Sequence, residues 1–188
     1  MKELREFIQR ITPEISDLEL DYIVSKFTIK TFEKGKFLIK RQQVCSDFSI
    51  VKQGCFRIFY RHEEKEINSW FAFERTPTTE MHSFITQKPT DYYIQAVEDS
   101  AVYTIPHKDL KELYRQFNVF QKFGLRLTET ILMHTIERLK SFQFETAEDR
   151  YNKIISDPNY TQRLPLKDLA SFLGVTPNSL SRLRNAKK

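Results

Sequence analysis

The spacing of apolar residues changes twice along this chain of 188 residues, and no other feature of the sequence limits the fold as strongly. Between residues 27 and 105, apolar and aromatic side chains alternate in short runs separated by turn residues, which is typical of antiparallel strands. Before residue 27 and after Pro106, they recur at helical spacing. The sequence therefore predicts an α+β protein in which helical segments flank an antiparallel sandwich or roll.

The short runs give the expected strands and two of their turns. Gly35 and Gly54 fall at turns, where a positive φ is favourable only for glycine. The expected strands lie on both sides of Gly35 within residues 27–37, and at residues 48–51, 55–60, 67–73, 92–97 and 101–105.

Helices are expected over residues 1–26, 107–117 and 147–156, and over a long segment, 119–141, that no proline interrupts. The long helix would extend about 30 Å, and its apolar side must be buried against the chain's own sheet or against a second copy of the same helix. Gly124 would permit a close approach between helices. The apolar side consists of Phe120, Phe123, Leu127, Ile131, His134 and Leu139.

The net charge of +5 is concentrated at the C-terminus. Residues 162–188 contain six basic residues and one acidic residue, Asp168, whereas the other 161 residues carry 24 charges of each sign. A local basic excess is the electrostatic footprint of a polyanionic partner such as DNA.

Residues 166–184 have the pattern of two helices joined by a tight turn. Ala170 is small enough for the point where the helices cross, and Gly174 suits the turn. Thr176 is placed as the N-cap of the second helix, with Pro177 as its first residue. The pattern predicts a helix-turn-helix. Its inward apolar positions are Leu169, Leu173, Val175, Leu180 and Leu183.

The outward positions of the second helix are polar or basic. Short polar side chains at a helix N-terminus, followed by arginines, suit a helix that enters the major groove of DNA, and the helix N-terminus can also hold a phosphate. The alternative is a helical hairpin with a solvated polar face. The predicted DNA-binding residues are Thr176, Asn178, Ser179, Ser181, Arg182 and Arg184.

Together these C-terminal patterns resemble the DNA-binding domain of Crp/Fnr-type (cyclic-AMP receptor protein family) transcription regulators, most closely the short forms common in Bacteroidetes. The matching segments are AEDRY at 147–151, LP at 164–165, DLA at 168–170, FLG at 172–174, TP at 176–177 and LSR at 180–182. The order of the remaining parts matches as well, so the resemblance covers essentially the whole chain.

The resemblance implies a homodimer that binds a palindromic operator in double-stranded DNA. It also implies an N-terminal antiparallel β jelly roll of the cyclic-nucleotide-binding type, with flanking helices, a long dimerisation helix and a C-terminal helix-turn-helix domain. The expected domains are residues 1–118, 119–143 and 144–188, with a hinge near Phe144.

In this family a phosphate-binding cassette holds the cyclic nucleotide: a Glu takes the ribose, an Arg neutralises the phosphate and a Ser completes the cradle. Glu80 matches the ribose position, but Thr79 stands at the preceding Gly, Thr90 at the Arg and Asp91 at the Ser. A buried phosphate then lacks its positive partner, and Asp91 adds repulsion if it is poorly solvated. We therefore expect that cyclic AMP does not bind.

The cavity of the roll would then hold another, uncharged or apolar effector, or none. Phe71, Phe73, Phe84 and Tyr92 are the expected lining residues, and the alternative is that these aromatic side chains only fill the core. Two cysteines, Cys45 and Cys55, are too few for a disulfide framework or a thiolate cluster. The four histidines lack metal-ligand spacing.

No nucleophile elbow, phosphate loop or catalytic pair of carboxylates is present, so we expect neither an enzyme nor a resident cofactor or metal. The N-terminus lacks the apolar core of a signal peptide, and no apolar run would cross a membrane, which predicts a cytoplasmic protein. The sequence thus predicts a transcription regulator with a degenerate effector pocket. The alternatives are a small-molecule-binding module whose helix-turn-helix contacts other proteins, and a cupin-like metalloenzyme.

Overall fold

The computed structural model describes residues 1–185, in two compact units. The first unit contains Met1–Ile58 and Phe71–Ile131, and the second contains Phe59–Trp70 together with the chain from Leu132 onwards. Lys187 and Lys188 of the basic C-terminus lie outside the described residues. The domain boundaries predicted near residues 118 and 143 remain a prediction, since the compact units divide the chain inside a helix.

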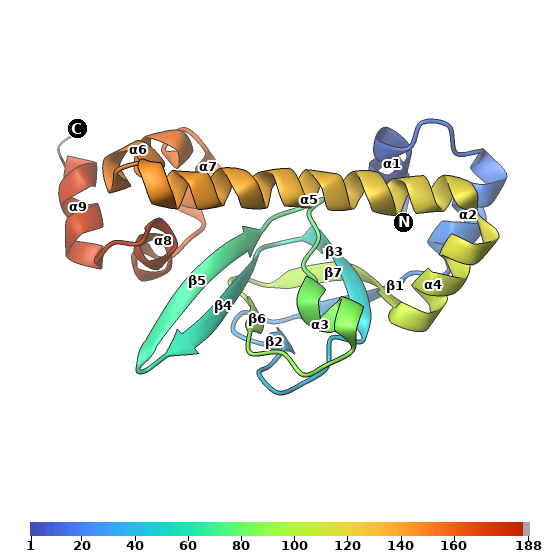
Figure 1. The fold of residues 1–188 in the computed structure, drawn as a ribbon, viewed down its shortest axis with the longest axis horizontal. Helices are drawn as coiled ribbons and strands as arrows, with labels where there is room; N and C mark the ends of the chain where they lie inside the picture. Colours follow the sequence, from blue (N-terminus) through green and yellow to red (C-terminus); the bar gives the residue numbers. More distant parts are fainter. Residues whose placement is uncertain (186–188) are drawn as a thin grey trace. The chain divides into compact units, whose positions relative to one another are not determined.

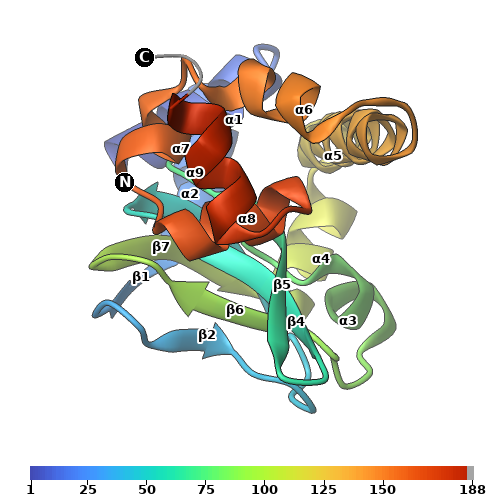
Figure 2. The same ribbon diagram turned by 90° about the vertical axis from the view of Figure 1, so that its left-hand side faces the viewer.

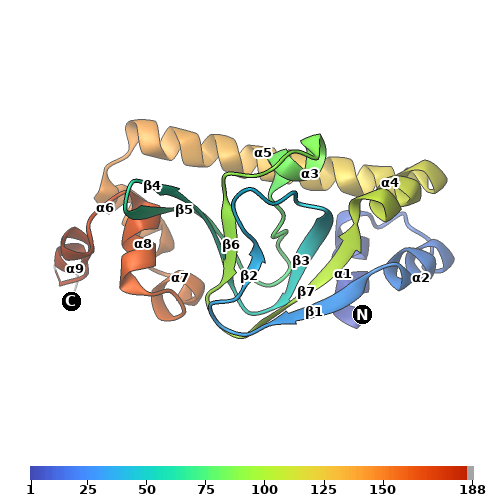
Figure 3. The same cartoon turned by 90° about the horizontal axis from the view of Figure 1, so that it is seen from below.

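Two antiparallel sheets form the roll, and Figure 3 shows β2 beside β6 and β1 beside β7. One sheet has the order β1-β7-β3, formed by Thr28–Phe32, Ser100–Pro106 and Asp47–Gln53. The other has the order β2-β6-β4-β5, formed by Phe37–Ile39, Tyr93–Ala96, Phe56–His62 and Lys65–Ala72. The predicted α+β class and the predicted strands are confirmed, and the turn at Gly35 carries the chain from one sheet to the other.

Alternating apolar residues build the core between the sheets. Ile50 of β3 pairs with Tyr103 of β7, and both side chains are buried. Phe32 of β1 meets Phe56 of β4 edge to face, with their ring centroids 5.6 Å apart. Such aromatic pairs stabilise beyond their buried area, so this contact ties the two sheets together. Gly35 has φ +83° and Gly54 has φ +90°, as the turns predicted.

Four further helices belong to the first unit, and the first two occupy the predicted segment 1–26. They are α1 (Lys2–Ile11), α2 (Asp17–Ser25), α3 (Met81–Thr86) and α4 (His107–Gln116). A capping box starts α2, because Ser16 accepts the backbone N–H of Glu19 while Glu19 accepts that of Ser16. The Tyr103 hydroxyl donates to Glu3 at 2.8 Å, which fastens α1 to β7.

The long helix α5 (Asn118–Phe144) runs without interruption, as predicted (Figure 1). Phe120, Phe123 and Leu127 are buried in the first unit, and Phe123 also contacts Phe7 of α1 at 6.0 Å between ring centroids. Its early turns therefore pack on the chain's own domain, one of the two partners considered. Exposed apolar side chains remain along the rest of the helix. They are Leu125, Leu132, Met133, Ile136, Leu139, Phe142 and Phe144.

Helices make up most of the second unit in the described part of the chain. They are α6 (Ala147–Ile154), α7 (Pro158–Gln162), α8 (Leu166–Leu173) and α9 (Pro177–Asn185). Thr146 and Asp149 form the capping box of α6. The sequence did not predict α7: Asp157 and Pro158 end α6, as expected, but they also begin α7 as its N-cap and first residue.

Gly124 lies against the ring of Tyr114 from α4, and this contact predicts an unusual response to alanine. A Cβ at residue 124 would lie 2.5 Å from Tyr114 Oη and 2.8 Å from Cζ. Alanine usually stabilises a helix interior by about 1 kcal/mol over glycine, but overpacking costs about 1–3 kcal/mol. We expect Gly124→Ala to lower the free energy of unfolding in urea by about 1 kcal/mol.

The matched control is Thr130→Ala, at an exposed position of the same helix, where the change should stay within about 0.5 kcal/mol. A Gly124→Ala protein more stable than the wild type would show that Tyr114 does not pack closely against this position.

Candidate functional site

Helices α8 and α9 lie where the helix-turn-helix was predicted and are joined by a short turn (Figure 2). Leu169, Ala170 and Leu180 are fully buried, which places the small Ala170 in the packed core of the two helices. Gly174 ends α8 in the left-handed region with φ +72°, where glycine avoids steric strain. The Val175 N–H donates to the Ala170 carbonyl at 3.0 Å and closes the turn.

Thr176 caps α9, as its position predicted. Its Oγ1 accepts the backbone N–H of Ser179 at 3.1 Å and lies 2.9 Å from the Ser179 hydroxyl. The helix then begins at Pro177, whose fixed φ suits a first helical residue. The cap fixes the N-terminus of α9, where amide groups and the helix dipole favour an anion.

The predicted DNA-binding side chains lie on the accessible face of α9. Thr176, Asn178, Ser179 and Arg182 are exposed, whereas Ser181 and Arg184 are half-buried. Within residues 1–185, neither arginine is engaged in an ion pair or a side-chain hydrogen bond. Their guanidinium groups are therefore available to an external partner.

Asp168, the acidic residue of the basic segment, is buried with an exposed fraction of 6%. The Asn68 amide of β5 donates to its Oδ1 at 3.4 Å and to its carbonyl oxygen at 3.3 Å. Next to it, the Ser171 hydroxyl donates to the Glu66 carbonyl and accepts the Asn68 N–H. The β4–β5 hairpin thus covers the carboxylate, which does not face solvent beside the arginines of α9.

Two arginines that the sequence analysis did not single out hold α8 in place. Arg150 of α6 donates to the Leu173 carbonyl at 3.0 Å and to the Glu145 carbonyl at 2.6 Å. Arg138 of α5 donates to the Phe172 carbonyl at 3.0 Å. Both guanidinium groups lie over the ring of Phe142, at 4.8 and 4.9 Å from its centroid.

This cluster of Arg138, Phe142 and Arg150, hereafter the arginine clamp, joins the end of α5 to the C-terminus of α8. Burial lowers the pKa of Arg138 to about 10, which still leaves it charged at neutral pH. A Cβ at Gly174 would lie 3.0 Å from the Phe142 ring, so the clamp also needs glycine at the turn. Arg150 belongs to the AEDRY segment, which was the signal in the sequence that pointed to it.

The side chains of Glu80, Thr79 and Thr90, at three of the cassette positions, already form hydrogen bonds with the backbone of the chain. Both carboxylate oxygens of Glu80 cap α3, because they accept the backbone N–H groups of His82 at 3.2 Å and Ser83 at 2.8 Å. The Thr79 hydroxyl accepts the Ser49 N–H at 2.8 Å. The Thr90 hydroxyl, which is buried, accepts the Tyr92 N–H at 2.9 Å.

Asp91 is not the poorly solvated carboxylate that would repel a bound phosphate. Its side chain is 83% exposed and pairs with Arg41 Nε at 3.3 Å. The condition for strong repulsion, a poorly solvated carboxylate, is therefore not met, because water screens a charge at the surface. The residue at the Arg position is the uncharged Thr90, so the lack of a positive partner for a phosphate there remains a prediction.

The four aromatic side chains predicted to line the effector pocket differ in their surroundings. Phe71, Phe73 and Phe84 are buried, and Tyr92 is half-buried. Phe84 contacts Phe48 at 6.0 Å and His107 at 4.9 Å between ring centroids.

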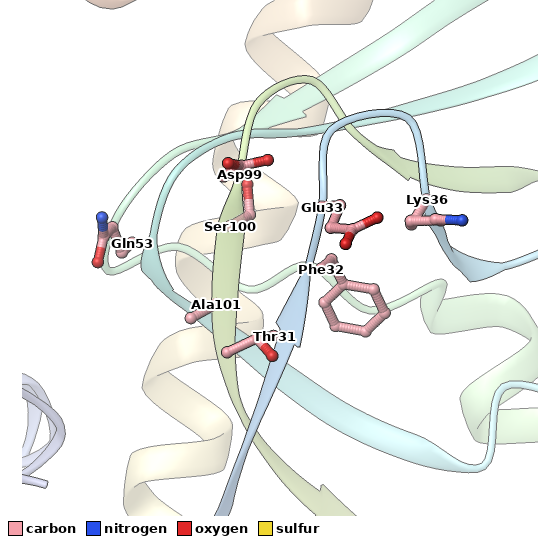
Figure 4. A pocket seen from close by; sticks show the side chains of 8 residues that line it. All are labelled: Thr31, Phe32, Glu33, Lys36, Gln53, Asp99, Ser100 and Ala101. Carbon is pink, nitrogen blue, oxygen red and sulfur yellow. The ribbon is translucent and has the colours of Figure 1, made fainter.

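The hollow shown in Figure 4, of about 630 Å³, lies elsewhere, at the end of the β1-β7-β3 sheet. None of these four aromatic residues lines it. Glu33 and Asp99 at its walls make it a poor phosphate site.

The described residues do not provide a metal-ion site or a reactive thiolate at Cys45. No group of three His, Cys, Asp or Glu side chains in residues 1–185 is placed to hold a metal ion. Burial raises the pKa of the Cys45 thiol to about 11, which disfavours the reactive thiolate. No helix in this part of the chain is long and apolar enough to cross a membrane.

Comparison with known proteins agrees with this architecture. Residues 29–117 match the family model of the cyclic nucleotide-binding domain. The fold is similar to that of FixK2 from Bradyrhizobium japonicum, with a TM-score of 0.73 and 14% identity over 85% of this chain and 83% of that one.

A catabolite activator protein from Thermus thermophilus gives a TM-score of 0.60 and 18% identity over 94% of this chain and 85% of that one. A crp/fnr-family protein from Eubacterium rectale gives a TM-score of 0.71 and 14% identity over 93% and 84%. No curated protein sequence matches significantly.

Residues 29–117 thus match a cyclic nucleotide-binding domain, and the chain has the fold of these solved proteins, with a roll followed by C-terminal helices. The resemblance to Crp/Fnr-type regulators predicted from the sequence is confirmed by this fold.

The arginine clamp predicts that Arg150 stabilises the second unit. Arg150→Ala removes the hydrogen bonds to Leu173 and Glu145 and the contact with Phe142, so we expect the free energy of unfolding to fall by about 1–3 kcal/mol. Trp70, the sole tryptophan, belongs to this unit, and its fluorescence during urea unfolding reports the change. Arg182→Ala serves as the control, because Arg182 is exposed and makes no ion pair or side-chain hydrogen bond in the described part of the chain. Equal stability of the two variants would contradict a structural role for the clamp.

Proposed function

We propose that this protein is a DNA-binding transcription regulator of the Crp/Fnr type, acting in the cytoplasm as a homodimer on a palindromic operator. The observation that carries the proposal is the accessible face of α9, where Arg182 and Arg184 have no ion pair or side-chain hydrogen bond to any of residues 1–185, on a capped, firmly packed helix. The chemistry of this face matches the base edges and phosphates of duplex DNA.

In this proposal α9 enters the major groove. Arginine pairs with guanine O6 and N7, while Asn178, Ser179 and Ser181 contact base edges or phosphates. Thr176 and the helix N-terminus hold a backbone phosphate. The burial of Asp168 supports this assignment, since no neighbouring carboxylate of α8 then opposes the phosphates.

The exposed stripe of α5 supports the homodimer. Leu125, Leu132 and Leu139 are seven residues apart, and each is more than half exposed. A seven-residue repeat of leucine is the pattern of a coiled-coil seam. At about 1.5 Å per residue the stripe extends some 21 Å, and a second copy of the helix would bury it.

We also propose that cyclic AMP is not the effector. The reason is the absence of a positive charge at Thr90, together with the use of both Glu80 oxygens as the cap of α3. Burying a cyclic phosphate there would cost the free energy of removing its charge from water, and no ionic partner would offset that cost.

Selection of genomic DNA fragments on the purified protein tests the proposed function. We expect enrichment of a palindromic site, and we expect Arg182→Ala/Arg184→Ala to weaken binding to it by about tenfold to a hundredfold. Arg115→Ala, which removes an exposed arginine of α4, is the matched control and should leave the affinity unchanged. Thermal unfolding of the three proteins shows whether the fold is retained.

Binding that is weak, independent of sequence and equal in the double variant would contradict the proposal. That outcome favours the alternative class, a small-molecule-binding module whose helix-turn-helix contacts proteins rather than DNA.

The dimer is tested by sedimentation equilibrium. Leu132→Asp places two carboxylates in the proposed symmetric interface, so we expect the dimer dissociation constant to rise more than a hundredfold, from the loss of about 1.5–3 kcal/mol of burial per leucine plus the charge penalty. Thr130→Asp, exposed on the same helix, is the control. A dimer equally tight in both variants would place the interface elsewhere.

A further inference from the structure

A cavity of about 180 Å³ lies within the first unit between α3, α4 and the early turns of α5. Its walls are largely apolar and include Phe48, Phe84, Leu110 and Leu127. Leu110 and Leu127 are themselves buried and belong to the packed core. Ile85, Lys111 and Thr128 are exposed, so the cavity opens to the surface. Water gains little in such a space, because it finds few hydrogen-bond partners.

The cavity has the volume needed to hold a small molecule with a single aromatic ring. An engineered apolar cavity of about 150 Å³ in another protein binds benzene, and the present cavity is slightly larger. The edge of the His107 ring meets the Phe84 ring at 4.9 Å with an interplanar angle of 80°. Aromatic walls of this kind suit an aromatic or other flat ring.

One polar group at the cavity has no internal partner. The Tyr114 hydroxyl lies beside Gly124, another lining residue, and accepts or donates no hydrogen bond within residues 1–185. Burial raises the pKa of Tyr114 to about 12, so the group remains a protonated donor. No carboxylate lines the cavity in the described part of the chain.

We infer that this cavity is a binding site for a small, neutral, ring-shaped apolar molecule that carries one hydrogen-bond acceptor, held by Tyr114 and the apolar walls. The site is distinct from the cassette positions Glu80 and Thr90, neither of which lines it. Of the residues predicted to line an effector pocket, it contains Phe84.

The position of the cavity gives its occupant influence over α5. Gly124, Leu127 and Thr128 of this helix form one wall, while α3 and α4 form others. A ligand would therefore fix α5 relative to α3 and α4 by contacts that the empty cavity lacks. This regulatory role rests on the proposed function, whereas binding itself does not.

Binding is measured with phenol and toluene as probes, on the full chain with labelled Leu and Ile methyl groups. We expect saturable shifts at Leu110, Leu127 and Ile131, with Leu4 and Leu20 unmoved. Toluene matches phenol in size but lacks the acceptor, so phenol should bind more tightly. Tyr114→Phe should weaken phenol by about threefold to tenfold, the loss of one hydrogen bond, and leave toluene unchanged.

A second test fills the opening of the cavity with one variant and compares it with a control variant at a position outside the cavity. Thr128 is exposed at the rim, so Thr128→Phe should keep the fold and abolish binding of both probes. Thr130→Phe places the same ring on an exposed position outside the lining and should bind them as the wild type does. Absence of saturable shifts in the wild type, or equal binding in the two variants, would overturn the inference.

The regulatory role is read separately, from the affinity for the selected operator with and without saturating phenol. A change in affinity that Thr128→Phe removes supports an effector site. Saturable binding with unchanged operator affinity would leave the site but refute its coupling to DNA, and failure to select any operator would count against the proposed function alone.

Discussion

The burial of Phe120, Phe123 and Leu127 against the first unit is the constraint on which the rest of the molecule depends. This burial removes large apolar side chains from water and stabilises the fold by about 25 cal/mol for each Å² of apolar surface buried. It thereby fixes the early turns of α5. These early turns of the helix are therefore part of the core of the first unit. Leu132, Arg138 and Leu139 follow later in the same helix and belong to the second unit.

Much of the fold followed from periodicity. The strands, the long helix and the helix-turn-helix were predictable because apolar spacing, Gly174 and the Thr176 cap are local signals. The helix α7 was not, since Asp157 and Pro158 serve as both a stop and a start. The exposed stripe of α5 was also missed, because Phe120 and Leu127 dominate the apolar pattern and conceal the heptad of Leu125, Leu132 and Leu139.

The candidate sites were predictable where local spacing sets them and unpredictable where contacts between distant residues set them. The face of α9 is set by one helix and its cap, so spacing alone gives the outward residues. Asp91 illustrates the opposite case: its exposure and its pairing with Arg41 depend on a residue 50 positions away. Arg138 and Arg150 bind backbone carbonyls of α8, and a sequence gives no sign of which distant carbonyls remain open at a helix end.

The separation between the inward and outward faces of α9 has an evolutionary consequence. Leu180 is fixed by the core and Gly174 by both its backbone angle and Phe142, so these positions tolerate little change. Asn178 and Arg182 are exposed and make no side-chain hydrogen bond or ion pair within residues 1–185, so these positions can vary at little cost to stability. Copies of such a gene can therefore diverge in the sequences they read without passing through unstable intermediates, because recognition and folding are inherited as independent traits.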